Sequence, residues 1–259
     1  MVKYFLLASI IFFVISCGKM TRNWEVDKSK LLAYDYRLFQ KTPAWELAKA
    51  LWDDDVKKIN ELVQKDKSLI NYHEPKFGET LLFLPMWHNQ LESFKLLLSL
   101  GANPNVYDTY DGSSPIIEAC KYDLNIEFVK ILLKNRANLN DIEVGERRDN
   151  NHTRYTPLMA AAKNGNIHLV KMLVDLGANI NYINEFGQSA LGQAVLLEKY
   201  EIILYLLQNG ADFKMPMYRN VVENKPIFIE EALQNMHPGL YSKDYKNKKM
   251  IVDFIKVSK

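Results

Sequence analysis

The apolar positions between residues 155 and 187 predict two short helices joined by a tight turn. The first helix opens at Thr156-Pro157, because proline fixes φ at a position where its missing N–H costs nothing. Asn164-Gly165-Asn166 makes the turn, since glycine tolerates a positive φ. The second helix carries an apolar face at helical spacing, made of Ile167, Val170, Leu173 and Val174. A helix pair with one apolar face cannot bury that face alone, so it must pack on copies of itself.

The same pattern recurs along the chain, because Thr156 and Ser189 are thirty-three positions apart, as are Gly177 and Gly210. One mark is a Thr-Pro-Leu-like triplet: Thr80-Leu81-Leu82, Ser114-Pro115-Ile116, Thr156-Pro157-Leu158 and Ser189-Ala190-Leu191. The other is a Gly-Ala-like pair after a leucine-rich helix: Gly101-Ala102, Arg136-Ala137, Gly177-Ala178 and Gly210-Ala211. Two marks that recur in the same order indicate a repeat protein.

These marks resemble the ankyrin repeat, whose pattern is T-P-L-H-x-A with a period near 33. The resemblance covers most of the chain from about Pro43 to Lys259. It implies an all-α, ankyrin-like repeat solenoid of about six helix-turn-helix units with loop or hairpin tips. We divide this single domain into residues 43–77, 78–111, 112–153, 154–186, 187–220 and 221–259. The two end units are weaker copies, as expected for capping repeats with one polar outer face.

Several positions depart from the ankyrin pattern. The usual histidine is replaced by Phe83, Ile117, Met159 and Gly192, so packing must substitute for the hydrogen bond that this histidine makes between repeats. Pro85 lies inside a first helix and should kink or shorten it. The interval from Asn140 to Thr156 is eight residues longer than the equivalent interval from Asn181 to Ser189, so a polar loop around Glu143 to His152 should protrude.

Residues 1–16 have the pattern of an export signal. Lys3 precedes an apolar run from Tyr4 to Ile15, which is too short to span roughly 30 Å of hydrocarbon. The run ends Val14-Ile15-Ser16-Cys17-Gly18, which resembles a bacterial lipoprotein signal, with Val14 where leucine is usual. The resemblance implies lipidation of Cys17 and a protein anchored in the cell envelope, at the outer membrane on its periplasmic side or at the surface. The alternatives are an ordinary signal peptide cut near Ser16 or an uncleaved anchor.

The segment 17–42 connects the lipid to the repeats. Gly18 to Lys30 is polar and mixed in charge, which is typical of a tether. Leu31 to Thr42 carries enough apolar residues for a short capping helix over the first repeat.

Composition narrows the function further. The 259 residues are 48% hydrophobic and carry 33 Lys and Arg against 31 Asp and Glu, so no overall field attracts nucleic acid. The two cysteines, Cys17 and Cys120, make no metal or redox pair, and Cys120 fits a buried thiol. The histidines are scattered, and Asp53-Asp54-Asp55 fits a helix cap better than a cation site. We therefore predict a non-enzymatic protein with no cofactor, no metal site and no nucleic-acid partner.

Aromatic residues mark the candidate binding surface. Alignment of the repeats places Trp52 and Trp87 at equivalent positions on the concave face, with Lys121 and Tyr122 next along. The loop tips add Tyr72, Phe77, Tyr107, Tyr110, Tyr182 and Phe186. Tryptophan and tyrosine commonly carry binding hot spots, because they bury much area at little rotamer cost. Alternatively, Trp52 and Trp87 fill the space left by a missing glycine turn, with Asp54 and Asn89 in its place.

The sequence thus predicts a monomeric, lipid-anchored module that binds a protein partner through its concave face and loop tips. Exported ankyrin-like lipoproteins look similar to immunity proteins that neutralise antibacterial toxins, which is one narrower version of this function. An envelope scaffold or a stress-related lipoprotein is the other.

Overall fold

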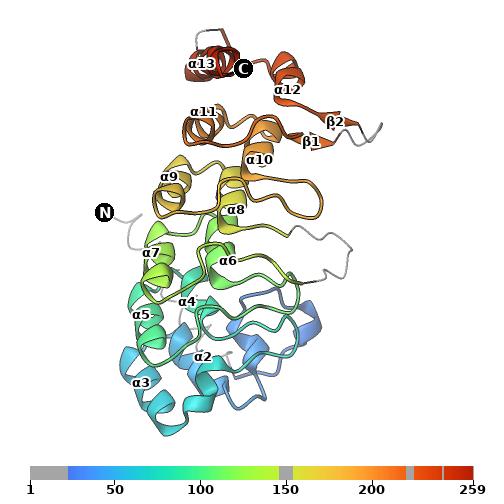
Figure 1. Ribbon diagram of the computed structural model, residues 1–259. Coiled ribbons are helices and arrows are strands. Elements are labelled where there is room, and N and C mark those ends of the chain that lie inside the picture. The colour runs from blue at the N-terminus through green and yellow to red at the C-terminus, as the bar shows by residue number, and fades with distance from the viewer. Residues whose placement is uncertain (1–22, 146–153, 220–224, 241, 259) are drawn as a thin grey trace, which may run out of the picture.

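The computed structural model describes residues 23–145, 154–219, 225–240 and 242–258. Cys17, the predicted export signal and the tip of the loop around Glu143 to His152 lie outside these residues. Six helix pairs stack in two rows within the described part of the chain (Figure 1). The inner row holds α2 (Trp45–Trp52), α4 (Phe83–Trp87), α6 (Pro115–Lys121), α8 (Pro157–Asn164), α10 (Ala190–Leu196) and α12 (Ile229–Asn235). The outer row holds α3 (Val56–Lys65), α5 (Leu91–Ser99), α7 (Ile126–Lys134), α9 (Ile167–Asp175), α11 (Tyr200–Gln208) and α13 (Lys243–Val257).

The predicted all-α repeat solenoid is therefore confirmed, with very little sheet. The strands β1 (Tyr218–Arg219) and β2 (Pro226–Ile227) pair antiparallel, with Tyr218 opposite Ile227. Short 3-10 helices cover Lys28–Lys30 (η1), Tyr36–Phe39 (η2) and Lys67–Asn71 (η3). None of the helices in the described residues has both the length and the apolarity that crossing a membrane requires.

Side-chain caps start the helices where the sequence predicts them. Thr156 Oγ1 accepts a hydrogen bond from the Met159 N–H at 3.2 Å, directly before Pro157 in the first turn. Asp55 Oδ1 accepts from the Lys58 N–H at 3.0 Å, so the expected capping role within Asp53-Asp54-Asp55 is confirmed. Each cap satisfies one of the amide donors that the first turn of a helix leaves unpaired.

The turn inside each of the first five repeats contains one residue with positive φ: Asp54 (52°), Asn89 (54°), Asp123 (52°), Gly165 (98°) and Glu198 (53°). Asp54 and Asn89 therefore stand where the best-preserved repeat has glycine, as the sequence predicts. This conformation costs a residue with a side chain roughly 1–2 kcal/mol, which the surrounding packing must offset. The turn residues also align the repeats. The residue two positions before each of them occupies an equivalent place in its repeat: Trp52, Trp87, Lys121, Lys163 and Leu196.

The structure accounts for two of the departures from the repeat pattern, one at Pro85 and one at Gly192. The helix α4, which contains Pro85, has 5 residues, whereas α8 has 8, so the predicted shortening is confirmed. A Cβ added to Gly192 would lie 2.2 Å from the Met217 carbonyl oxygen, so a histidine at this position has no room. Cys120 is a free and fully buried thiol, as predicted.

Asparagine side chains link successive repeats outside the helices. Four such bonds join an Asn Oδ1 to a backbone N–H of the next repeat: Asn71 to Asn103 (2.9 Å), Asn105 to Asn138 (2.9 Å), Asn140 to Asn179 (2.7 Å) and Asn181 to Asp212 (2.8 Å). In each bond the residue that donates its N–H directly follows a Gly-Ala-like pair. These bonds orient each loop on its neighbour. Hydrogen bonds between repeats are therefore supplied by the loops, in addition to the packing expected at the histidine position.

The predicted capping helix over Leu31 to Thr42 is wrong in form. Only Tyr36–Phe39 is helical there, as a 3-10 turn that buries Leu38 and Phe39 completely. Residues 31–35 are not helical. The chain before them is held by the Lys76 ammonium, which donates to the carbonyl oxygens of Lys28 (3.0 Å) and Ser29 (3.0 Å) in η1 and of Leu31 (2.6 Å). A lysine of the first repeat thus fixes the path of the chain before Tyr36.

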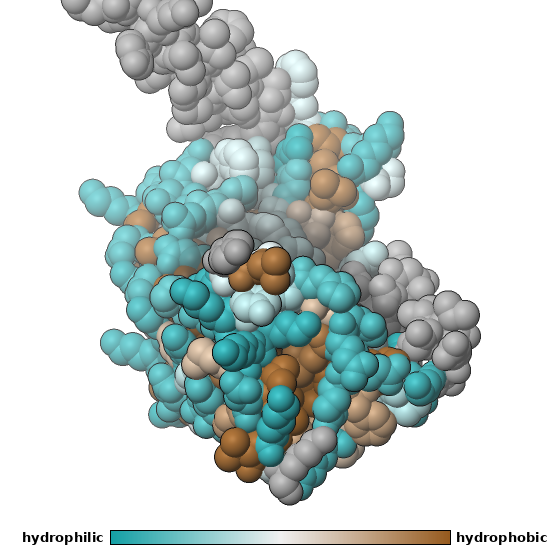
Figure 2. All heavy atoms as spheres, turned by 90° about the horizontal axis from the view of Figure 1, so that it is seen from above, coloured by the Kyte–Doolittle hydropathy of each residue, from teal (hydrophilic) through white to brown (hydrophobic). Residues whose placement is uncertain are grey.

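The last repeat closes the stack. Figure 2, seen from above, shows hydrophobic side chains in a narrow band between hydrophilic ones. A hollow of about 360 Å³ lies between α12 and α13, and its apolar residues are Leu233, Val252 and Ile255. The rest of α13 exposes mainly charged residues such as Lys246 and Lys249, which suits the outer face of a terminal repeat.

Candidate partner-binding groove

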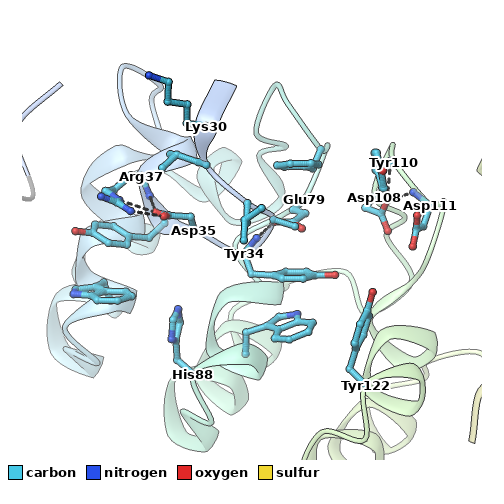
Figure 3. Close-up of a pocket in the computed structure, with 17 residues that line it drawn as sticks. Lys30, Tyr34, Asp35, Arg37, Glu79, His88, Asp108, Tyr110, Asp111 and Tyr122 are labelled. Atoms are coloured by element: carbon cyan, nitrogen blue, oxygen red, sulfur yellow. Dashed lines mark hydrogen bonds and ion pairs between the residues drawn. The ribbon is translucent and has the colours of Figure 1, made fainter. Parts of the chain in front are cut away.

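A groove of about 1000 Å³ lies over the inner-helix ends of the first three repeats (Figure 3). Residues 31–36, here called the N-terminal strap, form one wall. The repeats contribute five aromatic lining residues: Trp52, Phe77, Trp87, Tyr110 and Tyr122. All five are among the residues that the sequence predicts to bind a partner.

The strap inserts two tyrosines into the predicted aromatic row. Tyr36 stacks on Trp52, with ring centroids 4.4 Å apart and ring planes at 23°. Tyr34 stacks on Trp87 at 4.0 Å and 20°, and Trp87 in turn contacts Tyr122 at 4.9 Å. A row of aromatic rings therefore crosses the first three repeats, and two of its members come from the chain's own N-terminal segment.

Sequence reasoning missed these two tyrosines, because it assigned residues 31–42 to a helix. The spacing of Tyr34 and Tyr36 gives no periodic signal, because Tyr34 lies in a turn with a φ of 66° and Tyr36 begins a 3-10 helix, yet both rings fall on one side of the strap. Nothing local to the strap indicates that this side faces Trp52 and Trp87.

Two buried carboxyl groups hold Tyr34 in place. The Tyr34 hydroxyl donates to Glu118 Oε2 at 2.5 Å, and the Tyr34 N–H donates to Glu79 Oε2 at 2.8 Å. Burial raises the pKa of Glu79 to about 9. Burial also raises the pKa of Glu118, to about 7, although Lys121 acts in the opposite direction. Burial and the neighbouring Glu118 carboxylate raise the pKa of Tyr34 above its ordinary value, so Tyr34 stays a hydrogen-bond donor.

Lys121 lies among three buried carboxylates beneath this groove. Its Nζ is 2.6 Å from Asp111 Oδ2, 2.9 Å from Glu143 Oε1 and 3.5 Å from Glu118 Oε1. Burial alone would lower the pKa of Lys121, but attraction to Glu118 and Glu143 outweighs burial and raises it. This cluster of Lys121, Asp111, Glu118 and Glu143 gives Lys121 a role within the fold, and its contact with a partner stays a prediction.

The predicted surface residues differ in exposure. Tyr122 is 46% exposed and Trp52 is 42% exposed, whereas Trp87 is half-buried beneath Tyr34. Past the groove, Leu196 and Leu197 at the end of α10 are 48% and 42% exposed. They form a second exposed apolar patch, which the exposed Lys163 and Asn164 of the fourth repeat separate from the groove.

Most loop-tip aromatics pack against their neighbours. Phe77 and Tyr110 meet edge to face with ring centroids 5.8 Å apart. The Tyr107 hydroxyl donates to Asp141 Oδ1 at 2.6 Å, which links two adjacent hairpins. Tyr72 and Tyr182 are partly buried against the core, and Phe186 is exposed. Their binding to a partner stays a prediction.

Stacked helix pairs with long connecting hairpins and a groove across the inner-helix ends define a helical-repeat interaction module. A family model described as "Ankyrin repeats (3 copies)" matches residues 47–143 and 141–216. The chain therefore belongs to the ankyrin-repeat family, as the sequence marks predict. Ankyrin repeats are a protein–protein interaction module, and membership of the family does not identify the partner.

Similar proteins share the repeats with this chain. Neurogenic locus notch homolog protein 1 of Mus musculus is 30% identical over 171 residues, which cover 66% of this chain and 6% of that protein. Neurogenic locus notch homolog protein 2 of Homo sapiens is 32% identical over 163 residues, 63% of this chain and 6% of that protein. The chain thus spans about 6% of the length of these relatives. An ankyrin repeat domain from Acinetobacter baumannii AYE has the same fold, with a TM-score of 0.61 and 22% identity, over 80% of this chain and 96% of that chain.

Proposed function

We propose that this protein binds a protein partner through the groove and the exposed leucines at the end of the inner helix α10. The observation that carries the proposal is the apolar and aromatic surface formed by Trp52, Tyr122, Leu196 and Leu197, each at least 42% exposed. Exposed apolar residues gathered on one face favour an interaction site over random exposure.

The strap, which is not helical from residue 31 to residue 35, supports a partner that offers a non-helical segment. Its own residues meet the surface through stacked rings and hydrogen bonds to side chains of three different repeats. Trp52, Glu79 and Glu118 belong to the first, second and third repeat in turn. A non-helical segment can reach several repeats at once, because an extended chain rises up to about 3.3 Å per residue.

The test compares exposed residues inside and outside this surface. In the Tyr122→Ala/Leu196→Ala variant, affinity for a captured partner should fall by about 2 kcal/mol or more, roughly thirtyfold. Leu176→Ala is the matched control, because Leu176 is a 55% exposed leucine at the end of the outer helix α9. Trp87 is left unchanged because it supports Tyr34. Affinity that is unchanged in the double variant, or lost equally in Leu176→Ala, would refute the surface.

We also propose that the protein is anchored to a membrane outside the cytoplasm by a lipid on Cys17. The support is the sequence Val14-Ile15-Ser16-Cys17-Gly18 after an apolar run. Cells that express the protein and take up labelled palmitate should label it, and Cys17→Ala should abolish the label, whereas Cys120→Ala should retain it. Label that persists in Cys17→Ala would contradict the anchor.

The captured partner distinguishes the two narrower functions. A single partner bound in equal amounts, and toxic to cells that lack this protein, would favour an immunity protein. A mixture of envelope proteins would favour a scaffold.

A further inference from the structure

We propose that the site between Trp87 and Glu118 binds a tyrosine from a non-helical segment of the protein partner, and that Tyr34 occupies this site until the partner arrives. The inference rests on the proposed function and names the side chain that the partner offers. The site is here called the Tyr34 subsite.

The Tyr34 subsite combines a flat apolar face with an acceptor at its far end. Tyr34 lies on the Trp87 indole at a centroid distance of 4.0 Å, and its hydroxyl reaches Glu118 Oε2 at 2.5 Å (Figure 3). A tyrosine supplies both the ring and the donor. Phenylalanine supplies only the ring, and it would leave the buried Glu118 carboxyl without this partner.

The middle of the strap contains its most exposed residue and a residue with positive φ. Leu32 is 81% exposed, and Tyr34 is partly exposed and adopts a φ of 66°. For a residue with a side chain this conformation costs roughly 1–2 kcal/mol. A segment of a partner can make the same two contacts without that cost.

The ends of the strap can stay in place while Tyr34 leaves. At one end, Lys76 Nζ binds the Leu31 carbonyl oxygen at 2.6 Å. At the other end, Tyr36 is only 5% exposed and stacks between Trp45 and Trp52. Release of the residues between Leu31 and Tyr36 therefore opens the Tyr34 subsite while the cap over the first repeat remains packed.

The closing experiment supplies the strap as a separate molecule. The probe is an acetylated, fluorescently labelled peptide with the sequence of residues 30–37, titrated against the full-chain protein and followed by anisotropy. In the wild-type protein the peptide competes with Tyr34, whose effective concentration is on the order of millimolar because it is part of the same chain. We expect Tyr34→Ala to bind the peptide at least tenfold more tightly than the wild-type protein does.

Two controls distinguish specific binding of the peptide's tyrosine from non-specific binding of the peptide. The same peptide with alanine in place of the first tyrosine should lose the tenfold gain. Tyr205→Ala removes a tyrosine whose hydroxyl binds Asp175 at 3.0 Å on the outer row, and should bind the peptide as the wild-type protein does. Tyr34→Phe keeps the ring in place and loses only the hydroxyl, so its affinity for the peptide should lie between those of Tyr34→Ala and the wild-type protein.

Far-UV circular dichroism establishes that each variant is folded before titration. If Tyr34→Ala unfolds, the comparison of Tyr34→Phe with wild-type protein decides, since equal affinities there overturn the proposal. Equal affinities of folded Tyr34→Ala and wild-type protein for the peptide also overturn it. So does equal binding of the tyrosine and alanine peptides to Tyr34→Ala. This assay needs no natural partner, so its failure is distinct from failure of the Tyr122 and Leu196 test. A captured partner should likewise bind Tyr34→Ala more tightly than wild-type protein.

Discussion

Replacement of Lys121 by methionine tests what the buried cluster of Lys121, Asp111, Glu118 and Glu143 contributes to stability. The Lys121 ammonium contacts Asp111, Glu118 and Glu143, whose side chains are 9%, 1% and 2% exposed. At an effective dielectric constant of about 20, one such pair at about 3 Å gains roughly 5 kcal/mol before desolvation is subtracted. Removing one member of a buried ion pair costs about 3–5 kcal/mol, because the remaining charge is buried without a partner.

The loss should depend on pH in a defined direction. Without Lys121, the pKa of Glu118 should rise further above its unfolded value. The folded state then binds more protons than the unfolded state, so stability is present at low pH and is lost as pH rises through the folded pKa. Lys121→Met should therefore be more destabilising at pH 8 than at pH 5.5.

Urea unfolding followed by far-UV circular dichroism measures both effects. With a slope of about 2–3 kcal/mol per molar urea, the midpoint at pH 8 should fall by roughly 1–2 M. Lys130→Met is the matched control, because the Lys130 and Glu127 pair has a similar N···O distance of 2.7 Å but side-chain exposures of 52% and 48%. Such exposed pairs contribute at most about 1 kcal/mol. If the two variants lose the same stability at both pH values, the role assigned to the cluster is wrong.

Three further predictions concern buried positions. Burial raises the pKa of Glu79 from 4.5 to about 9, so its contribution to stability should fall as pH rises through this range; Glu79→Gln should flatten that dependence in the thermal midpoint, and an unchanged slope would contradict the prediction. Burial raises the pKa of the Cys120 thiol, so a thiol reagent should modify it only after unfolding, and rapid labelling of the folded protein would count against its burial. Gly192→Ala places a Cβ 2.2 Å from the Met217 carbonyl oxygen and should lower stability by about 1–3 kcal/mol in urea unfolding, whereas a neutral effect would show that the loop can move.

The sequence by itself determined the features that depend on neighbouring residues. The helix pairs follow from apolar spacing, the cap at Thr156 from its own side chain, and the turn at Gly165 from backbone freedom. The positions of Trp52 and Trp87 at equivalent points of adjacent repeats follow from the same period. Each of these features depends on residues within one turn or one repeat, so the local pattern predicts it.

Only the tertiary structure decided how the aromatic row is completed and what lies beneath it. Tyr34 bonds to Glu118, which is 84 positions away, and Lys121 contacts Glu143 in the following hairpin. The stacking of repeats brings these side chains together, and no local periodicity records which face of an irregular segment will be covered. The apolar residues of the strap resemble those of a capping helix, so the local sequence predicts a helix there. The actual path depends on Lys76, Trp87 and Glu118, which lie in the first, second and third repeats.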